Sequence, residues 1–281
     1  MMEILHYTFI QNALIAGVLV SLAAGIIGSL IVVNRMVFLA GGIAHSSYGG
    51  IGMAIFFGLP IFFGASLFAV GAALLVAWFT LKQRHRTDSF IGLVWAVGMA
   101  IGVIFVDLTP GYHVDLMSYL FGSILAVSRS DLGFMGVLLL LILFAVHRWY
   151  REILAVSYDS DYAALRGIPA NFIYLMILIL AALTVVVSIK VVGLILVIAL
   201  MTIPTYIAER CTKTLYGMMM LSGLLAILFT LVGLALSYRY DLTSGACIIL
   251  SAAAGLAIFS LGSWIKGKRN SDRKSMKETK D

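Results

Sequence analysis

The sequence has few charged residues and few cysteines, and both shortages narrow the classes of protein that it can encode. Only 11% of the 281 residues are charged, whereas 62% are hydrophobic and the mean hydropathy is +1.07. A soluble domain carries about a quarter charged residues, so this chain has too little polar surface to coat a water-soluble globule. The two cysteines, Cys211 and Cys247, lie far apart and match no metal-binding or redox spacing.

The chain also lacks the motifs of an ATPase or a hydrolase. Its one Walker-like string, residues 262–268, is followed by Arg269 where a magnesium-binding Ser or Thr would stand. No Ser-His-Asp arrangement, HExxH motif or cysteine pair accompanies it. We therefore predict a protein that is not an enzyme and that holds no permanent cofactor.

Apolar runs about as long as a membrane-spanning helix recur along the chain. The runs are continuous rather than alternating, which favours helices over strands. We predict an all-α, polytopic membrane protein with about nine transmembrane helices, or eight. Its membrane domain would cover residues 1–265, followed by a basic, disordered cytoplasmic tail over 266–281. The predicted spans are 9–33, 36–57, 60–81, 90–107, 119–147, 171–189, 191–208, 215–237 and 244–264.

Two places along these spans leave alternatives open. The 119–147 run is long for one span and carries Ser128-Arg129-Ser130-Asp131 in its middle. It therefore predicts either one long helix or a half-helix followed by a full one. The pair 171–189 and 191–208 is joined by Lys190 alone, which predicts a tight hairpin.

The positions of Lys and Arg predict the orientation in the membrane. If nine spans alternate, sixteen of the nineteen basic residues fall on one side, and only Arg129, Lys190 and Arg239 do not. The positive-inside rule places that side in the cytoplasm and the N-terminus outside. Seven basic residues follow Ile265, a typical topology signal after a last span, so the net charge of +6 does not indicate nucleic-acid binding.

One face of the second predicted span carries a histidine framed by glycines. Gly41, His45, Gly49 and Gly52 recur at helical spacing, and a second stripe of small residues, Gly42, Ser46 and Gly50, lies beside them. Small residues let neighbouring helices approach closely, so we expect this helix to be surrounded by protein. An ionisable residue near mid-membrane tends to face the bundle interior or an aqueous path. His45 is therefore either a metal ligand or a packing residue that bonds a neighbouring hydroxyl.

Two loops carry further candidates. Asp107, His113 and Asp115 surround a Pro-Gly turn on the predicted outer side, where they would either attract a cation to a pore mouth or serve as solvated turn residues. On the inner side, Asp159 to Arg166 predicts a short helix that ends at Gly167 and Pro169. Such a helix would dock a soluble partner or lie on the membrane surface.

Several blocks in order resemble the zinc/manganese/iron permease family of ATP-binding-cassette importers, along nearly the whole chain. They are AHSSYGGIG at 44–52, DLMSYLFGSIL at 115–125, the segment from Tyr158 to Gly167, KVVGLILVIALMTIP at 190–204 and DLTSGA at 241–246.

This resemblance implies a pore made by two permease copies in the bacterial cytoplasmic membrane, most simply a homodimer. It also implies a cytoplasmic ATP-binding subunit and an extracytoplasmic metal-binding protein as partners, and a divalent metal, zinc or manganese with iron as a third choice, as the transported ion. The family's pore histidine matches His45. Its coupling helix matches the inner segment, with Asp159, Asp161, Ala163, Ala164 and Gly167 as the residues that contact the ATPase.

The sequence departs from the family where an acidic residue commonly precedes the pore histidine by four positions, because Gly41 stands there. Losing a carboxylate removes a hard oxygen ligand and a negative charge. This departure keeps open a permease for a metal chelate such as a siderophore. An ion-coupled secondary transporter is a further alternative, although the predicted span interiors hold almost no acidic residues for coupling.

Overall fold

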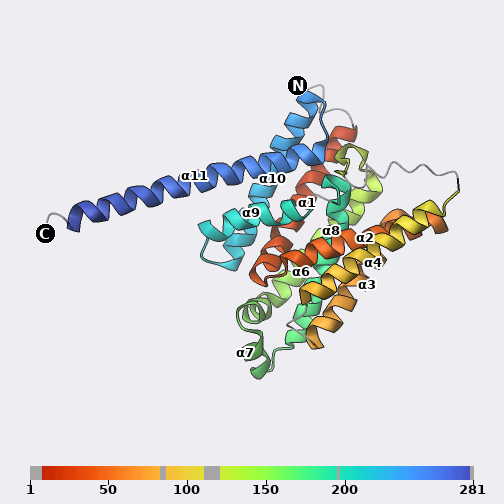
Figure 1. Ribbon diagram of the computed structural model, residues 1–281, viewed down its shortest axis with the longest axis horizontal. Coiled ribbons are helices and arrows are strands. Elements are labelled where there is room, and N and C mark those ends of the chain that lie inside the picture. The colour runs from red at the N-terminus through yellow and green to blue at the C-terminus, as the bar shows by residue number, and fades with distance from the viewer. Residues whose placement is uncertain (1–7, 83–86, 111–120, 195–196, 279–281) are drawn as a thin grey trace.

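The computed structural model describes residues 8–82, 87–110, 121–194 and 197–278, and every regular element within these ranges is helical. The elements follow one another as labelled in Figure 1: α1 (Thr8–Val33), α2 (Val37–Phe57), α3 (Ile61–Lys82), α4 (Thr87–Asp107), η3 (Ile124–Ala126), α6 (Arg129–Tyr158), α7 (Ser160–Leu165), α8 (Ala170–Val192), α9 (Val197–Cys211), α10 (Leu215–Tyr240) and α11 (Ser244–Glu278).

Seven of the described helices are long and apolar enough to cross a membrane, which confirms the polytopic helical class. The two predicted spans outside this group are α2 and α9. With 15 residues, α9 is about 22 Å long, shorter than the ~30 Å hydrocarbon core. The 21 residues of α2 are long enough, but Gly, Ser, Tyr and His interrupt its apolar character. The count of nine or eight spans therefore stays a prediction.

The interior of the bundle is built around α1 and α8, which are buried over about two thirds or more of their most apolar stretch. Around them pack α10, α9 and α6, which contact α1, and α2 and α3, which contact α8. Pairs of hydroxyl groups bond across helices, Ser21 with Thr230 (2.9 Å) and Thr205 with Ser222 (2.7 Å). Such bonds satisfy polar groups that lipid cannot.

The helices α2, α3 and α4 lie side by side (Figure 1). α2 is joined to α3 by a tight turn in which Gly58 adopts φ +66° and Leu59 N donates to Ala54 O at 2.8 Å. This is the helix-ending geometry that glycine permits without strain. Neighbours on several sides, α3, α4, α8 and α9, surround α2 with protein.

The 119–147 run contains one full helix rather than a single long span from its start. Ser128 caps α6, because its hydroxyl accepts from Asp131 N and its own N–H donates to the Asp131 carboxylate. The capping box fixes the helix start at Arg129. Before it, residues 122–128 form irregular chain with one 3₁₀ turn at η3. At the other end α6 continues to Tyr158, with a kink at Trp149, so it extends well past the predicted end at residue 147.

The connection between α8 and α9 does not lie at Lys190, where the hairpin was predicted, but follows Val192. Lys190 lies in the last turn of α8, which ends at Val192, and Gly193 with φ +88° caps it. The charge does not end the helix because Lys190 pairs with an aspartate of α6. α9 begins at Val197.

The short inner helix matches its prediction closely. α7 covers Ser160–Leu165, with Asp159 as its N-cap, accepting from Asp161 N and Tyr162 N, and Gly167 at φ +79° after its end. By contrast, no change of secondary structure marks the boundary predicted at residue 265. α11 continues to Glu278, through a segment rich in the helix-favouring residues Lys, Arg, Met and Glu.

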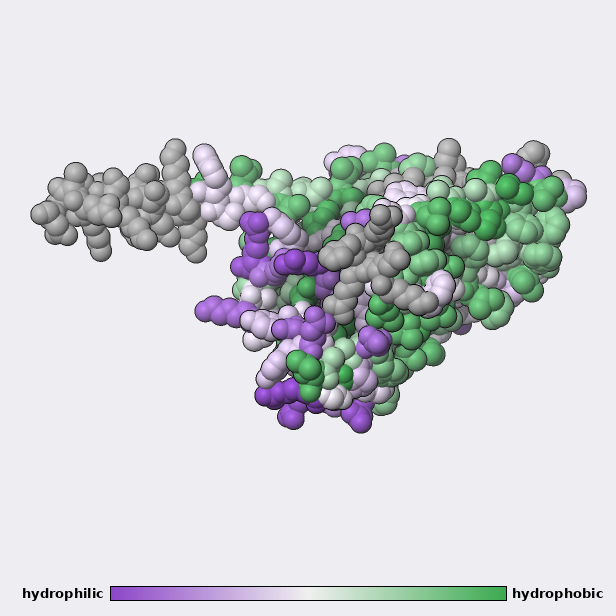
Figure 2. Space-filling model, turned by 60° about the horizontal axis from the view of Figure 1, so that its bottom comes forward, coloured by the Kyte–Doolittle hydropathy of each residue, from purple (hydrophilic) through white to green (hydrophobic). Residues whose placement is uncertain are grey.

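The surface matches a membrane-embedded body. Figure 2 shows a broad hydrophobic surface over much of the molecule, with hydrophilic residues gathered toward one end. The exposed apolar residues include Leu140, Leu250 and Ile258, each about 70% exposed. In water such a surface would drive aggregation, whereas acyl chains cover it at no cost.

Candidate functional site

The glycines of α2 bring its backbone against two neighbouring helices. A Cβ placed on Gly52 would lie 2.3 Å from the carbonyl oxygen of Gly102 in α4. One placed on Gly49 would lie 2.7 Å from the carbonyl oxygen of Gly98, and 2.8 Å from the Phe68 ring of α3. Distances this short leave no room for a side chain, so α2 and α4 touch backbone to backbone.

His45 lies on this helix with its imidazole stacked on the indole of Trp95 in α4. The ring centroids are 4.2 Å apart and the planes differ by 8°. The side chain is half-buried, and its Nδ1 is buried without a hydrogen-bond partner among the residues that the structure describes. The expected bond from a neighbouring hydroxyl is absent there, because Ser46 and Ser47 donate to carbonyls of their own helix instead. Stacking therefore holds the ring in place while Nδ1 makes no hydrogen bond in the described part of the chain.

Gly41, one turn before His45, faces α9. A Cβ at this position would approach Cδ1 of Ile198 to 2.6 Å. An aspartate here would therefore displace the Ile198 side chain. The position that lacks the acid thus packs against an apolar side chain.

Of the three outer-loop candidates, one lies in the described part of the chain. Asp107 is the exposed last residue of α4, whereas His113 and Asp115 lie outside the described residues. No group of three or more His, Cys, Asp or Glu side chains comes together in the described part of the chain. A complete four-ligand metal site of the structural kind is therefore not formed by these residues in one copy.

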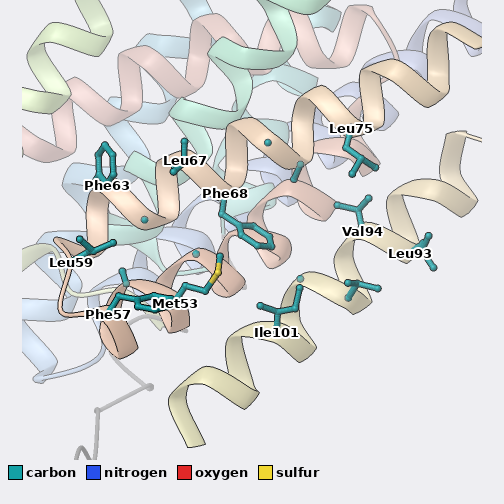
Figure 3. Close-up of a pocket in the computed structure, with 17 residues that line it drawn as sticks. Met53, Phe57, Leu59, Phe63, Leu67, Phe68, Leu75, Leu93, Val94 and Ile101 are labelled. Carbon is teal, nitrogen blue, oxygen red and sulfur yellow. The ribbon is translucent and has the colours of Figure 1, made fainter. Parts of the chain in front are cut away.

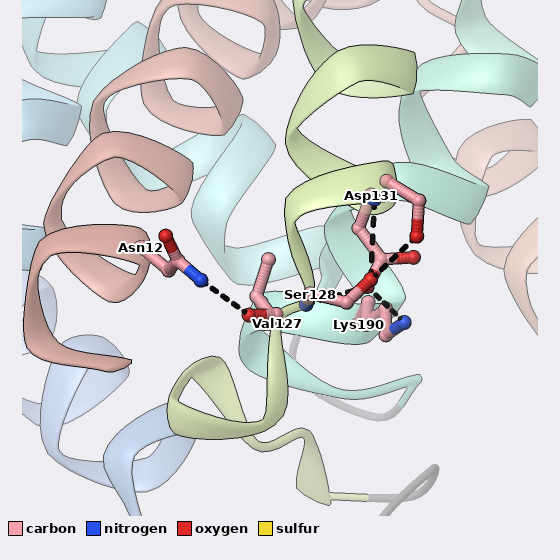
Figure 4. A network of polar contacts seen from close by, with 6 residues as sticks. Asn12, Val127, Ser128, Asp131 and Lys190 are labelled. Carbon is pink, nitrogen blue, oxygen red and sulfur yellow. Dashed lines mark hydrogen bonds and ion pairs between the residues drawn. The ribbon is translucent and has the colours of Figure 1, made fainter. Parts of the chain in front are cut away.

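An ion pair that was not predicted from the sequence lies on the predicted outer side. The ammonium of Lys190 in α8 lies 2.5 Å from the carboxylate of Asp131 in α6, which also accepts from the N–H of Ser128 at 2.8 Å (Figure 4). Asn12 of α1 donates to the Val127 carbonyl at 3.3 Å, so the irregular segment is held from both sides. Two signals pointed here: Ser128-x-x-Asp131 is a capping pattern, and Lys190 is a lone charge between two apolar runs, where a charge needs a partner.

Glycines close the backbone around this ion pair. A Cβ on Gly122 would lie 2.3 Å from Gly193 N, and one on Gly245 would lie 2.4 Å from the Phe121 carbonyl oxygen. The irregular segment, the end of α8 and the start of α11 therefore meet at backbone contact. Irregular chain at membrane depth is tolerated where protein surrounds it.

The coupling-helix candidates divide by exposure. Asp159, Asp161, Ala164 and Gly167 are exposed, but Ala163 is buried. Leu165, which no sequence signal singles out, is 88% exposed. An exposed leucine on a short inner helix provides apolar surface for contact with a partner.

A large hollow lies between α2, α3 and α4 (Figure 3), with a volume of about 650 Å³. All of its lining residues are apolar or glycine, among them Met53, Phe63, Leu67 and Ile101. A hydrated metal ion needs polar ligands, so this hollow is not a metal path.

These features define a class: a polytopic helical membrane protein with a protein-enclosed, histidine-bearing helix and a short capped inner helix. Residues 6–263 match the family model described as the ABC 3 transport family. The chain belongs to this family, whose members are transport permeases of the bacterial cytoplasmic membrane rather than enzymes. This confirms the resemblance drawn from the five sequence blocks.

Individual relatives agree. The chain is 47% identical over 258 residues to an uncharacterized membrane protein of Synechocystis sp., covering 92% of each chain. It is 32% identical over 256 residues to the manganese transport system membrane protein MntC of Halalkalibacterium halodurans, covering 91% of this chain and 88% of that protein. Among solved structures, PsaBC from Streptococcus pneumoniae in complex with Fab is similar with a TM-score of 0.82 and 28% identity, over 90% of this chain and 91% of that one.

Proposed function

We propose that this protein is the membrane-spanning subunit of an ATP-driven importer for a divalent transition-metal ion. The family match carries the proposal, and the manganese named for the MntC relative supports a metal as cargo. Manganese and zinc are the leading ions and iron is the third. Within the bundle, this proposal places the His45 imidazole on the ion's path.

The pore forms between two copies of the chain. His45 provides one ligand per copy, and the described part of one copy gathers no further cluster of ligand-type side chains. A second copy would double the number of imidazoles, and water molecules would complete the coordination shell. A site with few protein ligands releases its ion readily, as transport requires.

The partners contact opposite ends. A cytoplasmic ATP-binding subunit docks on α7, through its exposed residues Asp159, Asp161, Ala164 and Gly167 and through Leu165. An extracytoplasmic metal-binding protein docks on the outer side, where Asp107, His113 and Asp115 would receive the ion.

One observation favours the alternative of a metal chelate as cargo. Gly41 packs against Ile198 where family members commonly carry an acid, so the path loses a charge that a bare cation would use. A chelate such as a siderophore needs less charge because its own ligands hold the metal.

The test is uptake into proteoliposomes that contain this chain with its ATP-binding subunit and binding protein. We expect uptake of radioactive Mn²⁺ or Zn²⁺ that requires ATP, and His45→Ala should lower it roughly tenfold or more, because even groups that support a metal ligand contribute 10–100-fold. Ser47→Ala is the matched control, since the Ser47 hydroxyl donates to its own helix at the Ala44 carbonyl.

The alternatives give different results. Uptake of a ferric siderophore but of no free ion would establish the chelate importer. Uptake driven by an ion gradient without ATP would establish a secondary transporter. Unchanged uptake by His45→Ala would assign His45 to packing alone.

A further inference from the structure

A basic hollow lies where the kinked end of α6 meets the start of α10. Its volume is about 780 Å³, and it is lined by Leu143, Val146, His147, Arg148, Tyr150, Arg151, Glu152 and Tyr216. In the orientation predicted from Lys and Arg, this is the cytoplasmic edge of the membrane. None of these residues belongs to the proposed ion path or to α7.

The hollow continues a lipid-facing stripe of α6. Val137, Leu140 and Phe144 recur at helical spacing and are 64–68% exposed. One turn further along the helix, His147 and Arg148 are exposed as well, and Arg151 follows after the kink at Trp149. An apolar surface followed by a cationic one is complementary to a phospholipid, in which apolar acyl chains are followed by an anionic phosphate.

The cationic groups are available for an anion. Neither Arg148 nor Arg151 makes an ion pair within the described part of the chain, although the Arg148 guanidinium lies over the Trp149 ring at 5.5 Å. The Tyr150 hydroxyl accepts from the N–H of Tyr216 at 3.2 Å, which ties α6 to α10. Its own proton therefore remains free to donate to a phosphate oxygen.

We propose that this hollow binds the headgroup of one anionic phospholipid of the phosphatidylglycerol type. Arg148, Arg151 and His147 would hold the phosphodiester, and the acyl chains would lie along Leu140 and Phe144. Glu152, which lines the same hollow, would accept from the glycerol hydroxyls. Two arginines and a histidine against one carboxylate favour an anionic lipid over a zwitterionic one. Basic pockets between helices at this depth are suited to anionic headgroups.

The experiment measures lipid binding to the purified full-length chain by native mass spectrometry, with phosphatidylglycerol, phosphatidylethanolamine and phosphatidylcholine of equal chain length. We expect one phosphatidylglycerol to bind more tightly than the other two lipids. Arg148→Gln or Arg151→Gln should weaken it about fivefold each, since a basic residue at an anionic surface contributes about 1 kcal/mol. The double Gln variant should weaken it about thirtyfold.

Two controls separate this site from general positive charge. Arg210→Gln removes an exposed arginine that stacks on Tyr206 at the end of α9, and it should leave binding unchanged. The double Arg→Lys variant keeps the charge and should retain most of the affinity, which excludes misfolding as the cause of the loss. Equal affinity for the three lipids, or equal losses in the Arg210 control, would overturn the proposal. So would displacement of the lipid by inorganic phosphate at matched concentration, because the site would then serve a free anion.

Discussion

The helices α2 and α4 lie close together because their contact residues are glycines, whose side chains are single hydrogen atoms. At Gly52 an added methyl group would lie 2.3 Å from the Gly102 carbonyl oxygen, and at Gly102 one would lie 2.5 Å from the Tyr48 carbonyl oxygen. The contact is therefore reciprocal. Because the atoms met are backbone, neither helix yields by rotating a side chain.

Gly52→Ala should accordingly destabilise the protein. We expect a loss of about 1–3 kcal/mol, the usual cost of overpacking, measured as a lower thermal unfolding midpoint in detergent. The matched control is Gly136→Ala in α6, where an added Cβ meets nothing within 4 Å. That change should leave the midpoint equal or raise it, since alanine favours helix over glycine. Equal effects of the two substitutions would contradict the close approach.

At the scale of residues, the sequence predicted where small side chains would bring helices together, but it did not predict which residues would contact them. The glycine spacing around His45 predicted a helix enclosed by protein, because small side chains at helical spacing have a direct steric meaning. The sequence did not predict that Trp95 stacks on His45 or that Ile198 faces Gly41. Those contacts join residues about 50 to 160 positions apart, and no local pattern specifies them.

At the scale of elements, α6 and α8 are fastened by one ion pair. Asp131 lies in the first turn of α6 and Lys190 in the last turn of α8, and their side chains are 12% and 32% exposed. A charge at this depth without its partner is costly. The pair therefore fixes the relative position of the two helices next to the irregular segment 122–128.

We expect Asp131→Asn and Lys190→Met each to lower stability, by about 1–2 kcal/mol after allowance for partial exposure. The double variant should be less destabilised than the sum of the two, with a coupling of about 1 kcal/mol. Unfolding followed for all four proteins of the cycle measures this coupling. Strict additivity would mean that the pair contributes nothing beyond its separate residues.

Element boundaries divide into two groups. Those of α7 were predictable, since Asp159 at the start and Gly167 with Pro169 at the end are local signals. The end of α8 was not, because a lysine between two apolar runs suggests a loop until its partner is known. The end of α6 did not follow from the predicted span either: charged residues from Arg148 onward indicated the end of the span at residue 147, whereas the helix itself continues to Tyr158.

For the whole molecule, the proposed pore requires two copies with α2 near their common axis. His45→Cys in a background with Cys211→Ser and Cys247→Ala should form a species of twice the mass when treated with a short bifunctional thiol reagent. Leu140→Cys, placed on the lipid-facing side of α6 at 68% exposure, should not. Gel electrophoresis of the complex with its ATP-binding subunit measures both. Crosslinking of the Leu140→Cys variant but not of the His45→Cys variant would place α6, rather than α2, near the common axis.

The sequence by itself determined the class of protein, its helical nature, its predicted orientation and its short inner helix. Each of these depends on local composition: hydropathy over about twenty residues, the sides on which Lys and Arg fall, and capping residues. The tertiary structure alone decided that His45 stacks on Trp95, that Asp131 pairs with Lys190, that Ala163 points inward, and that three glycine-bearing segments meet at backbone contact. These are contacts between distant parts of the chain, and they exist only once the helices have packed.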